Sequence, residues 1–292
     1  MKYVDNLELG EKVIIEDYPE FKNSKFSSDN SGWTNFAIKV DDKYIFRFPR
    51  NNEAYQAINK EILILQHLKE ALPLNIKVPN YIYSKLDRDY PYVGYEKIEG
   101  EFLDKESYDN LSDLDKSKLL DDIVTFLNIL HKIDYQKFNL EITNPMEKYK
   151  ELYNNIKEKC FKYFDEELKT KTVELFETYF NDENMFNYIP TLIHGDLSED
   201  HILIADDGIG IIDFGDVFVF NPDYDFTWAY LLDESFFDDL VEKYKGNKDN
   251  NFKYKIKNFH LKIIPYYGVL YADKIKDEDL LKREIEELRN CL

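Results

Sequence analysis

The sequence predicts an α+β protein with two lobes, a small mostly-β lobe at the N-terminus and a larger mostly-α lobe after it. Three observations support this fold class. Short β-rich runs fill most of the first hundred residues, the helical period prevails from Leu111 onward, and a single β-hairpin interrupts those helices. A short connector near residues 96–100 separates the two patterns. We therefore expect an N-terminal lobe at residues 1–97 and a C-terminal lobe at residues 98–292.

The N-terminal lobe is expected to contain one helix among several strands. Residues 36–40 and 43–48 are β-rich runs, and Asp41-Asp42 between them suits a hairpin turn. Residues 53–68 then carry apolar side chains at helical spacing, before Pro73 interrupts the period. Two further strands are expected at residues 81–83 and 92–95.

The C-terminal lobe is expected to be helical around its one hairpin. Ser112 gives an N-cap signal before an apolar face that runs on to Leu130. Residues 202–205 and 209–214 predict the two strands of the hairpin, joined by Asp-Asp-Gly, with polar residues just before and just after them. The later helical stretches are expected at residues 146–180, 224–244, 251–272 and 277–290.

Composition excludes several classes of function. The 292 residues hold 38 Lys+Arg against 58 Asp+Glu, a formal net charge of −20, which disfavours a general binder of nucleic acid or of anionic membranes. A cationic ligand or no charged partner suits this balance better. The 23 Tyr and 21 Phe argue against disorder. Two distant cysteines, an N-terminus without a secretory pattern and the lack of an 18-residue apolar run predict a monomer of the reducing cytosol.

One segment carries the chemistry. His194-Gly195-Asp196 is followed by four residues and then by His201, and Asp213-Phe214-Gly215 begins seventeen residues after Asp196. In protein kinases the catalytic loop reads His-Arg-Asp, four residues and Asn, and a later Asp-Phe-Gly supplies a metal-binding Asp. Either tripeptide alone is weak evidence. Both in this order, joined by a hairpin and preceded by a β-rich lobe, are a specific signal.

Transfer of a γ-phosphoryl group explains these residue types. The reaction needs a divalent cation on the phosphate oxygens and a carboxylate that orients the attacking hydroxyl and accepts its proton. Mg²⁺ is usually held by one or two carboxylates, with phosphate and water completing its shell. We expect Asp196 to be the base, and Asp213 and His201 to be the metal ligands. The alternative is structural, with Asp213 capping a turn and His194 packed in a core.

At these residues the chain resembles the aminoglycoside phosphotransferases, and most closely their 2″-phosphotransferase branch. The wider family usually has Asn where this chain has His201, whereas the 2″ branch has His. The resemblance extends from about residue 20 to residue 245. The segments that carry it are residues 192–203, 210–216 and 221–226, with weaker similarity at residues 44–50 and 94–100.

The resemblance implies a two-lobed protein-kinase-like fold and a nucleotide-dependent kinase. ATP or GTP would be the phosphate donor, Mg²⁺ the cofactor, and the 2″-hydroxyl of a cationic aminoglycoside the acceptor, which would confer antibiotic resistance. Two alternatives stay open. One is the same chemistry on another small acceptor (choline, homoserine, a macrolide or a thio-sugar), and the other is a catalytically silent nucleotide-binding protein. A protein kinase is disfavoured because no Ala-Pro-Glu follows Asp213.

The nucleotide phosphates need backbone N–H groups and a cation. The segment with Ser31 and Gly32 stands where kinases have a glycine-rich loop, although it holds one glycine only. Arg47 is our candidate phosphate cation and Glu61, on the following helix, its ion-pair partner. Arg replaces the usual Lys here, and its fork also matches phosphate oxygens. Lys39 lies too soon after the loop, so its expected place is in solvent.

The connector is expected to hold the nucleotide base. By resemblance to kinase hinges, backbone groups of Glu96 and Ile98 would bond the base edge. A bulky Tyr95 beside the base would favour guanine over adenine.

Carboxylates are expected to bind the ammonium groups of the acceptor. An ordinary solvated acidic face is an equal alternative for the helical candidates. Tyr266 and Tyr267 could line the sugar rings, although core packing is the preferred interpretation of both. The candidate carboxylates are Asp200, beside the catalytic loop, and Asp233, Glu234 and Asp238 in the helical region after the hairpin.

Overall fold

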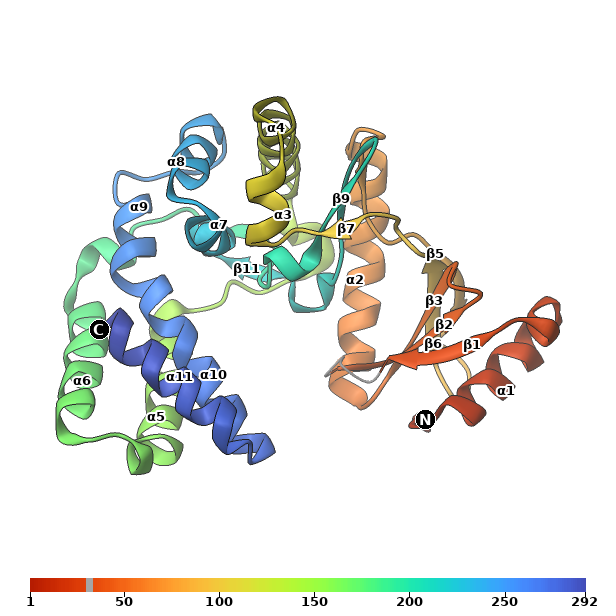
Figure 1. Cartoon of the computed structure of the whole chain (residues 1–292), viewed down its shortest axis with the longest axis horizontal. Helices are drawn as coiled ribbons and strands as arrows, with labels where there is room; N and C mark the ends of the chain where they lie inside the picture. The colour runs from red at the N-terminus through yellow and green to blue at the C-terminus, as the bar shows by residue number, and fades with distance from the viewer. Residues whose placement is uncertain (30–33) are drawn as a thin grey trace. The chain divides into compact units, whose positions relative to one another are not determined.

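Five antiparallel strands form the sheet of the N-terminal part (Figure 1), in the order β1-β2-β3-β6-β5. The computed structural model describes residues 1–29 and 34–292. The predicted hairpin is present, and Asp41 and Asp42 turn it with φ of 53° each, a left-handed conformation that Asp tolerates. The bounds are β1 Phe26–Asp29, β2 Asn35–Val40, β3 Tyr44–Pro49, β5 Tyr81–Lys85 and β6 Tyr92–Glu96.

Two helices accompany this sheet, so the expectation of a single helix was wrong. The predicted helix is α2, Asn52–Ala71, and the Asn51 side chain caps it by accepting from the Ala54 N–H. The unpredicted helix is α1, Leu7–Asp17, capped in the same way by Asn6. Val13 and Ile14 of α1 are buried in one core with aromatic side chains of β2 and β3. The short amphipathic stretch escaped notice because Gly10 interrupts its apolar pattern.

The predicted second hairpin is also present, at the centre of a four-stranded sheet with the order β4-β10-β9-β7. Its second strand ends at Ile211, earlier than predicted, so Asp213 lies beyond the sheet. Ser112 caps the helix α4 as expected, by accepting from the Asp115 N–H. The bounds are β4 Ile76–Lys77, β7 Glu101–Phe102, β9 Ile202–Ala205, β10 Gly208–Ile211, α3 Lys105–Asn110 and α4 Asp113–Leu130.

The chain divides into two compact units. Unit 1 consists of Met1–Leu130 and His194–Val217, and unit 2 of His131–Ile193 and Phe218–Leu292. Unit 1 thus combines the N-terminal sheet with α3, α4 and the second hairpin. The expected lobes at 1–97 and 98–292 were drawn from the ligands that each is expected to bind, whereas the two units are compact bodies of the fold. The division into these lobes stays a proposal.

Unit 2 is mostly helical, and three of the predicted long helices are divided. Asp165 and Asp233 begin new helices by accepting backbone N–H bonds, which splits residues 146–180 and 224–244. A π-helix, Ile256–His260, divides residues 251–272. The bounds are α5 Pro145–Lys159, α6 Glu166–Asn181, α7 Thr227–Leu232, α8 Glu234–Lys243, α9 Phe252–Lys255, α10 Leu261–Ile275, α11 Glu278–Cys291, β8 Thr191–Ile193 and β11 Phe218–Phe220.

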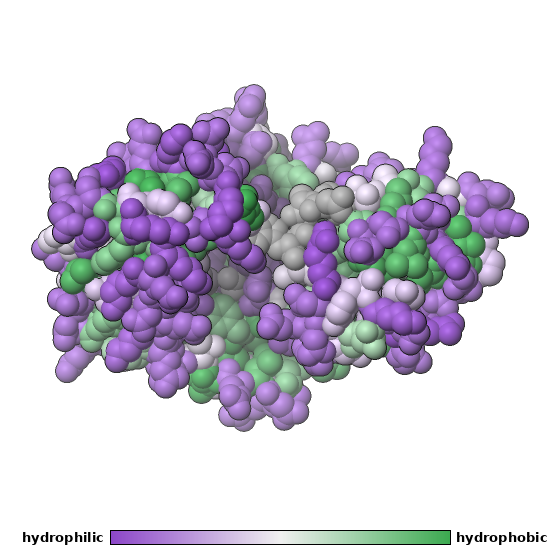
Figure 2. All heavy atoms as spheres, turned by 90° about the horizontal axis from the view of Figure 1, so that it is seen from below, coloured by the Kyte–Doolittle hydropathy of each residue, from purple (hydrophilic) through white to green (hydrophobic). Residues whose placement is uncertain are grey.

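Among the helices within residues 1–29 and 34–292, none is long and apolar enough to cross a membrane. Hydrophilic residues cover most of the face drawn in Figure 2, with hydrophobic groups exposed between them. The charged composition is therefore visible at the surface. Short 3₁₀ turns complete the fold at Pro19–Asn23, Tyr135–Phe138, Phe161–Tyr163, Glu183–Met185, Glu199–His201, Phe214–Asp216 and Pro222–Phe226.

Candidate active site

The loop from His194 to His201 lies in unit 1 and is anchored to the end of the second hairpin. The His194 side chain is fully buried, and its Nε2–H donates to the backbone oxygen of Ile212 at 3.0 Å. Gly195 turns the chain with φ of 83°, a conformation that side-chain-bearing residues rarely adopt, so that the next residue, Asp196, stands exposed.

His201 is held in one tautomer by the same loop. Its Nδ1 lies 2.6 Å from the backbone oxygen of Asp196 and 3.3 Å from the Ser198 hydroxyl. A carbonyl oxygen only accepts, so Nδ1 carries the proton and donates it. In the neutral ring Nε2 then keeps its lone pair, which is the form of histidine that binds metals.

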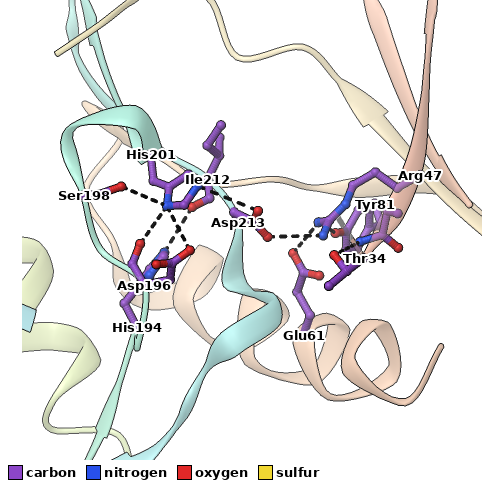
Figure 3. Close-up of polar contacts among 11 residues, drawn as sticks. Thr34, Arg47, Glu61, Tyr81, His194, Asp196, Ser198, His201, Ile212 and Asp213 are labelled. Atoms are coloured by element: carbon purple, nitrogen blue, oxygen red, sulfur yellow. Dashed lines mark hydrogen bonds and ion pairs between the residues drawn. The ribbon is translucent and has the colours of Figure 1, made fainter. Parts of the chain in front are cut away.

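The two predicted carboxylates flank this imidazole (Figure 3). Asp196 Oδ2 lies 3.7 Å from His201 Nδ1, and Asp213 Oδ2 lies 3.8 Å from His201 Nε2. Their side chains are 55% and 43% exposed, respectively. Because each side chain is about half exposed, a ligand can reach both carboxylates. The carboxylates at 196 and 213 share one environment, as the motif required.

The backbone of Asp213 is strained. Its φ of 62° and ψ of 65° place it in the left-handed region, two residues past the end of β10. The predicted strand at residues 209–214 would include Asp213, and that expectation was wrong. Side-chain contacts hold Asp213 instead, since its Oδ1 lies 3.4 Å from Arg47 Nη2 while its Oδ2 faces His201. Strained residues of this kind concentrate at functional sites.

Arg47 and Glu61 form the predicted ion pair. Arg47 Nη1 donates to Glu61 Oε1 at 2.8 Å and to the Tyr81 hydroxyl at 2.8 Å. Burial alone lowers the pKa of the Arg47 guanidinium, but the electrostatic interactions with Glu61, Tyr81, Asp213 and Tyr95 together outweigh burial and raise that pKa well above its ordinary value. Burial raises the pKa of the fully buried Glu61, and the charge of Arg47 opposes that shift. Tyr81 was not predicted from the sequence.

The residues present fit a magnesium ion. In the part of the chain that the structure describes, no group of three or more His, Cys, Asp or Glu side chains could hold a metal. Mg²⁺ does not need such a group, because it keeps waters and takes phosphate oxygens together with one or two protein ligands. The Asp213 carboxylate and His201 Nε2 supply that smaller set. Imidazole is a softer ligand than carboxylate, which makes Mn²⁺ an alternative occupant.

The expected base-binding connector lies beside the second hairpin of unit 1. The Lys97 N–H donates to the backbone oxygen of Lys43 at 2.8 Å, which ties the connector to β3. Ile98 packs over Gly210 so closely that a Cβ at residue 210 would lie 2.4 Å from Ile98 Cγ2. Glu96 is exposed and pairs with Lys43 at 3.5 Å. Base binding by Glu96 and Ile98 stays a prediction, and Ser31 and Gly32 lie outside the described residues.

The candidate carboxylates for the acceptor are divided between the units. Asp200 is exposed on the catalytic loop of unit 1, whereas the other three belong to unit 2. Asp233 caps α8, Glu234 pairs with Lys257 at 2.6 Å, and Asp238 pairs with Lys253 at 2.6 Å. The α8 carboxylates therefore already have partners, and their role toward a cationic ligand stays a prediction.

The two tyrosines considered for the acceptor differ in exposure. Tyr266 is fully buried and its hydroxyl donates to Thr172, as the preferred core interpretation required. Tyr267 is 38% exposed.

Comparison with known proteins follows this geometry. Residues 25–251 match the model of a family described as the phosphotransferase enzyme family. Among solved structures, the GDP and kanamycin complex of APH(2″)-IIIa is 27% identical to this chain, with a TM-score of 0.87 over 97% of this chain and 98% of that one.

Two further structures extend the comparison. The GDP complex of wild-type aminoglycoside 2′-phosphotransferase-IIIa is 26% identical, with a TM-score of 0.85 and 98% of each chain covered. A macrolide 2′-phosphotransferase of type I is 18% identical, with a TM-score of 0.71 and 99% of each chain covered, so it shares the fold alone. The two-lobed kinase-like fold class is thereby confirmed.

Proposed function

The chain belongs to the phosphotransferase enzyme family, and from that premise we propose that it phosphorylates an aminoglycoside at the expense of ATP or GTP. The 2″-hydroxyl is the acceptor in this proposal. Its support is the likeness over nearly the whole chain to APH(2″)-IIIa and to the structure named aminoglycoside 2′-phosphotransferase-IIIa. The observation that carries it is the single imidazole of His201, which has Asp196 on one ring nitrogen and Asp213 on the other.

Each polar group of the site has one task in this reaction. Asp196, exposed and past the turn at Gly195, orients the acceptor hydroxyl and takes its proton as the new O–P bond forms. The bond between the γ-phosphorus and the β–γ bridging oxygen breaks at the same time, and the nucleoside diphosphate leaves with that oxygen. Arg47 binds nonbridging phosphate oxygens through its guanidinium. Asp213 and His201 Nε2 would hold the metal, and Glu61 keeps the buried charge of Arg47 balanced. Mg²⁺, when bound, neutralises the charge that develops on the β- and γ-phosphate oxygens.

The proposal also includes a choice between GTP and ATP as the phosphate donor. Tyr95 is buried on β6, and its ring packs edge-on against Tyr81 at 5.7 Å. A bulky side chain at this position narrows the space next to the connector. We therefore propose GTP as the better donor, in agreement with the GDP bound by two similar structures.

The test is an assay of nucleoside diphosphate release with an acceptor panel. Kanamycin, gentamicin, a macrolide, choline and homoserine are each supplied with GTP or ATP and Mg²⁺. We expect turnover with kanamycin or gentamicin, and mass spectrometry should find one added phosphoryl group on the 2″-oxygen. The Asp196→Asn variant serves as the matched control, because it keeps the shape of the side chain and removes its basicity.

Two results would revise the proposal. Turnover confined to the macrolide, choline or homoserine would keep the chemistry and change the acceptor. Nucleotide binding without turnover of any acceptor, equal in wild type and Asp196→Asn, would favour the catalytically silent alternative. A susceptible bacterial host that expresses either protein gives an independent comparison, since only the active one should raise the aminoglycoside concentration needed to stop growth.

A further inference from the structure

An irregularity in strand β5 places the Tyr81 side chain at the site. Tyr81 pairs with Tyr95 of β6, and Tyr83 pairs with Gly94, so two residues along β5 advance only one residue along β6. Such a β-bulge reverses the alternation of side chains along the strand. Consequently, two tyrosines that a regular strand would place on one face lie on opposite faces of the sheet.

The two tyrosines have correspondingly different surroundings. The Tyr83 ring packs with Phe21 and Phe46 in the aromatic core beside α1. The Tyr81 hydroxyl accepts from Arg47 Nη1 and also interacts with Glu61, on the face that carries α2. The bulge is thus the local feature that brings a phenol to the guanidinium.

The Arg47 fork is divided between two sets of partners (Figure 3). Both partners at Nη1 are fixed by the fold, Glu61 from α2 and Tyr81 from β5, each at 2.8 Å. The partner at Nη2 is Asp213 Oδ1, at the longer distance of 3.4 Å. An amino group of guanidinium has two N–H bonds, so Glu61 and Tyr81 together use both donors of Nη1.

We propose that Tyr81 is a positioning residue for the phosphate-binding cation. Its hydroxyl and Glu61 fix one terminal nitrogen of Arg47, which keeps the other terminal nitrogen directed at Asp213 and at the phosphates of a bound nucleotide. The inference rests on the proposed function, because it assumes that a nucleotide occupies unit 1. It assigns Tyr81 a role that it exerts through Arg47.

The choice of arginine at position 47 follows from the same geometry. A lysine ammonium is a single point charge and could pair with Glu61, but it has no second nitrogen that a neighbouring hydroxyl could orient. A phenol could still accept a hydrogen bond from an ammonium group, but only beside a guanidinium can it orient a second nitrogen. Burial raises the pKa of Tyr81 well above its ordinary value, so the hydroxyl stays neutral and available at any physiological pH.

The test is a double-mutant cycle read out by nucleotide binding alone. Calorimetry measures the Kd of GDP and of ADP, without Mg²⁺ and without acceptor, for wild type, Tyr81→Phe, Arg47→Lys and the double variant. Tyr81→Phe removes one oxygen and leaves a buried N–H without its acceptor, so we expect Kd to rise about tenfold. In the Arg47→Lys background the same substitution should change Kd less than about twofold. Tyr83→Phe, on the same strand and the opposite face, is the matched control and should bind like wild type.

The outcomes separate this inference from the proposed function. An unchanged Kd in Tyr81→Phe, or an equal loss in both backgrounds, would overturn the positioning role, and thermal melts show whether each variant is folded. Failure of every acceptor in the turnover assay would reject the proposed acceptor and leave the GDP result readable. Wild-type protein that binds neither GDP nor ADP would contradict the proposed function and this inference together.

Discussion

Two groups of acidic side chains, one in each unit, differ in their exposure to solvent and in the distances to their partners. In unit 1, Asp196 and Asp213 are about half exposed, and their ion-pair distances to His201 are 3.7 and 3.8 Å. In unit 2, Asp223 and Asp225 are 0% and 1% exposed. Asp223 lies 3.2 Å from Lys255 and 3.1 Å from His260, and Asp225 lies 3.0 Å from His131.

The difference separates the carboxylates that we propose to bind ligands from carboxylates that stabilise the fold. A buried carboxylate must be paired within the protein, because an unpaired charge in the interior costs several kcal/mol. A half-exposed carboxylate keeps contact with solvent, so a substrate or a metal can reach it. Motif and burial together therefore distinguish the two classes, although both sets are aspartates near the same stretch of sequence.

The largest expected effect sharpens the comparison at Asp196. Asp196→Asn should lower kcat by about 10³-fold, because the acceptor hydroxyl loses its base. The midpoint of thermal unfolding should stay within a few degrees of wild type, since the side chain is exposed. Steady-state kinetics and calorimetry on the same preparation measure both quantities. A large loss of stability at full activity would place Asp196 in the structural class.

The second effect belongs to unit 2. Asp223→Asn leaves the buried Lys255 without one of its two carboxylate partners, and we expect the free energy of unfolding to fall by about 3 kcal/mol. Urea denaturation followed by far-UV circular dichroism measures it. Asp213→Asn is the comparison variant, with an expected change below about 1 kcal/mol. Equal stability of the two variants would break the distinction drawn here.

The third effect is a pH dependence of stability. Asp273 in unit 2 accepts from the Tyr163 hydroxyl and from Lys162, and these bonds lower the pKa of its carboxyl to about 2. A carboxyl whose pKa is lowered on folding stabilises the fold above its unfolded pKa of about 4, and that stabilisation is lost as the pH falls toward 2. We expect the free energy of unfolding to decline less steeply between pH 4 and pH 2 in Asp273→Asn than in wild type. Parallel pH profiles would contradict this assignment.

The smallest effect tests a candidate for acceptor binding. Asp238 forms an exposed ion pair with Lys253, and such pairs contribute less than about 1 kcal/mol, so Asp238→Asn should barely change stability. If Asp238 also binds the acceptor, the KM of the Asp238→Asn variant for kanamycin should be several-fold higher than that of wild type, while its KM for GTP stays constant. Asp239→Asn, the neighbouring exposed position, is the matched control. An unchanged KM for kanamycin would favour the alternative interpretation, in which Asp238 belongs to an ordinary solvated acidic face.

Sequence predicted the fold best where one local signal decided the structure. The hairpin turned by Asp41-Asp42 and the cap at Ser112 were found because the residues that cause them are adjacent. The helices divided at Asp165 and Asp233 were missed, because an acidic residue inside a helical period can be either a surface position or a cap. Only the packing of each segment decides between these roles.

The site shows the same limit. Asp196, His201 and Asp213 were predictable because their spacing reflects one loop and one hairpin. Tyr81 was not predictable, since its contact with Arg47 depends on the strand register and on a bulge, and no sequence signal near Tyr81 indicates either. The left-handed backbone of Asp213 likewise depends on contacts with elements distant in sequence.

The central claim is that Asp196, His201 and Asp213 form one phosphoryl-transfer site. The most direct test is a crystal structure with Mn²⁺ and a nonhydrolysable GTP analogue, in which anomalous scattering locates the metal. The account predicts a peak bound by both Asp213 Oδ2 and His201 Nε2, next to the γ-phosphate and within reach of the Asp196 carboxylate. A metal–nucleotide complex bound elsewhere, with these three side chains still facing one another as in Figure 3, would contradict it.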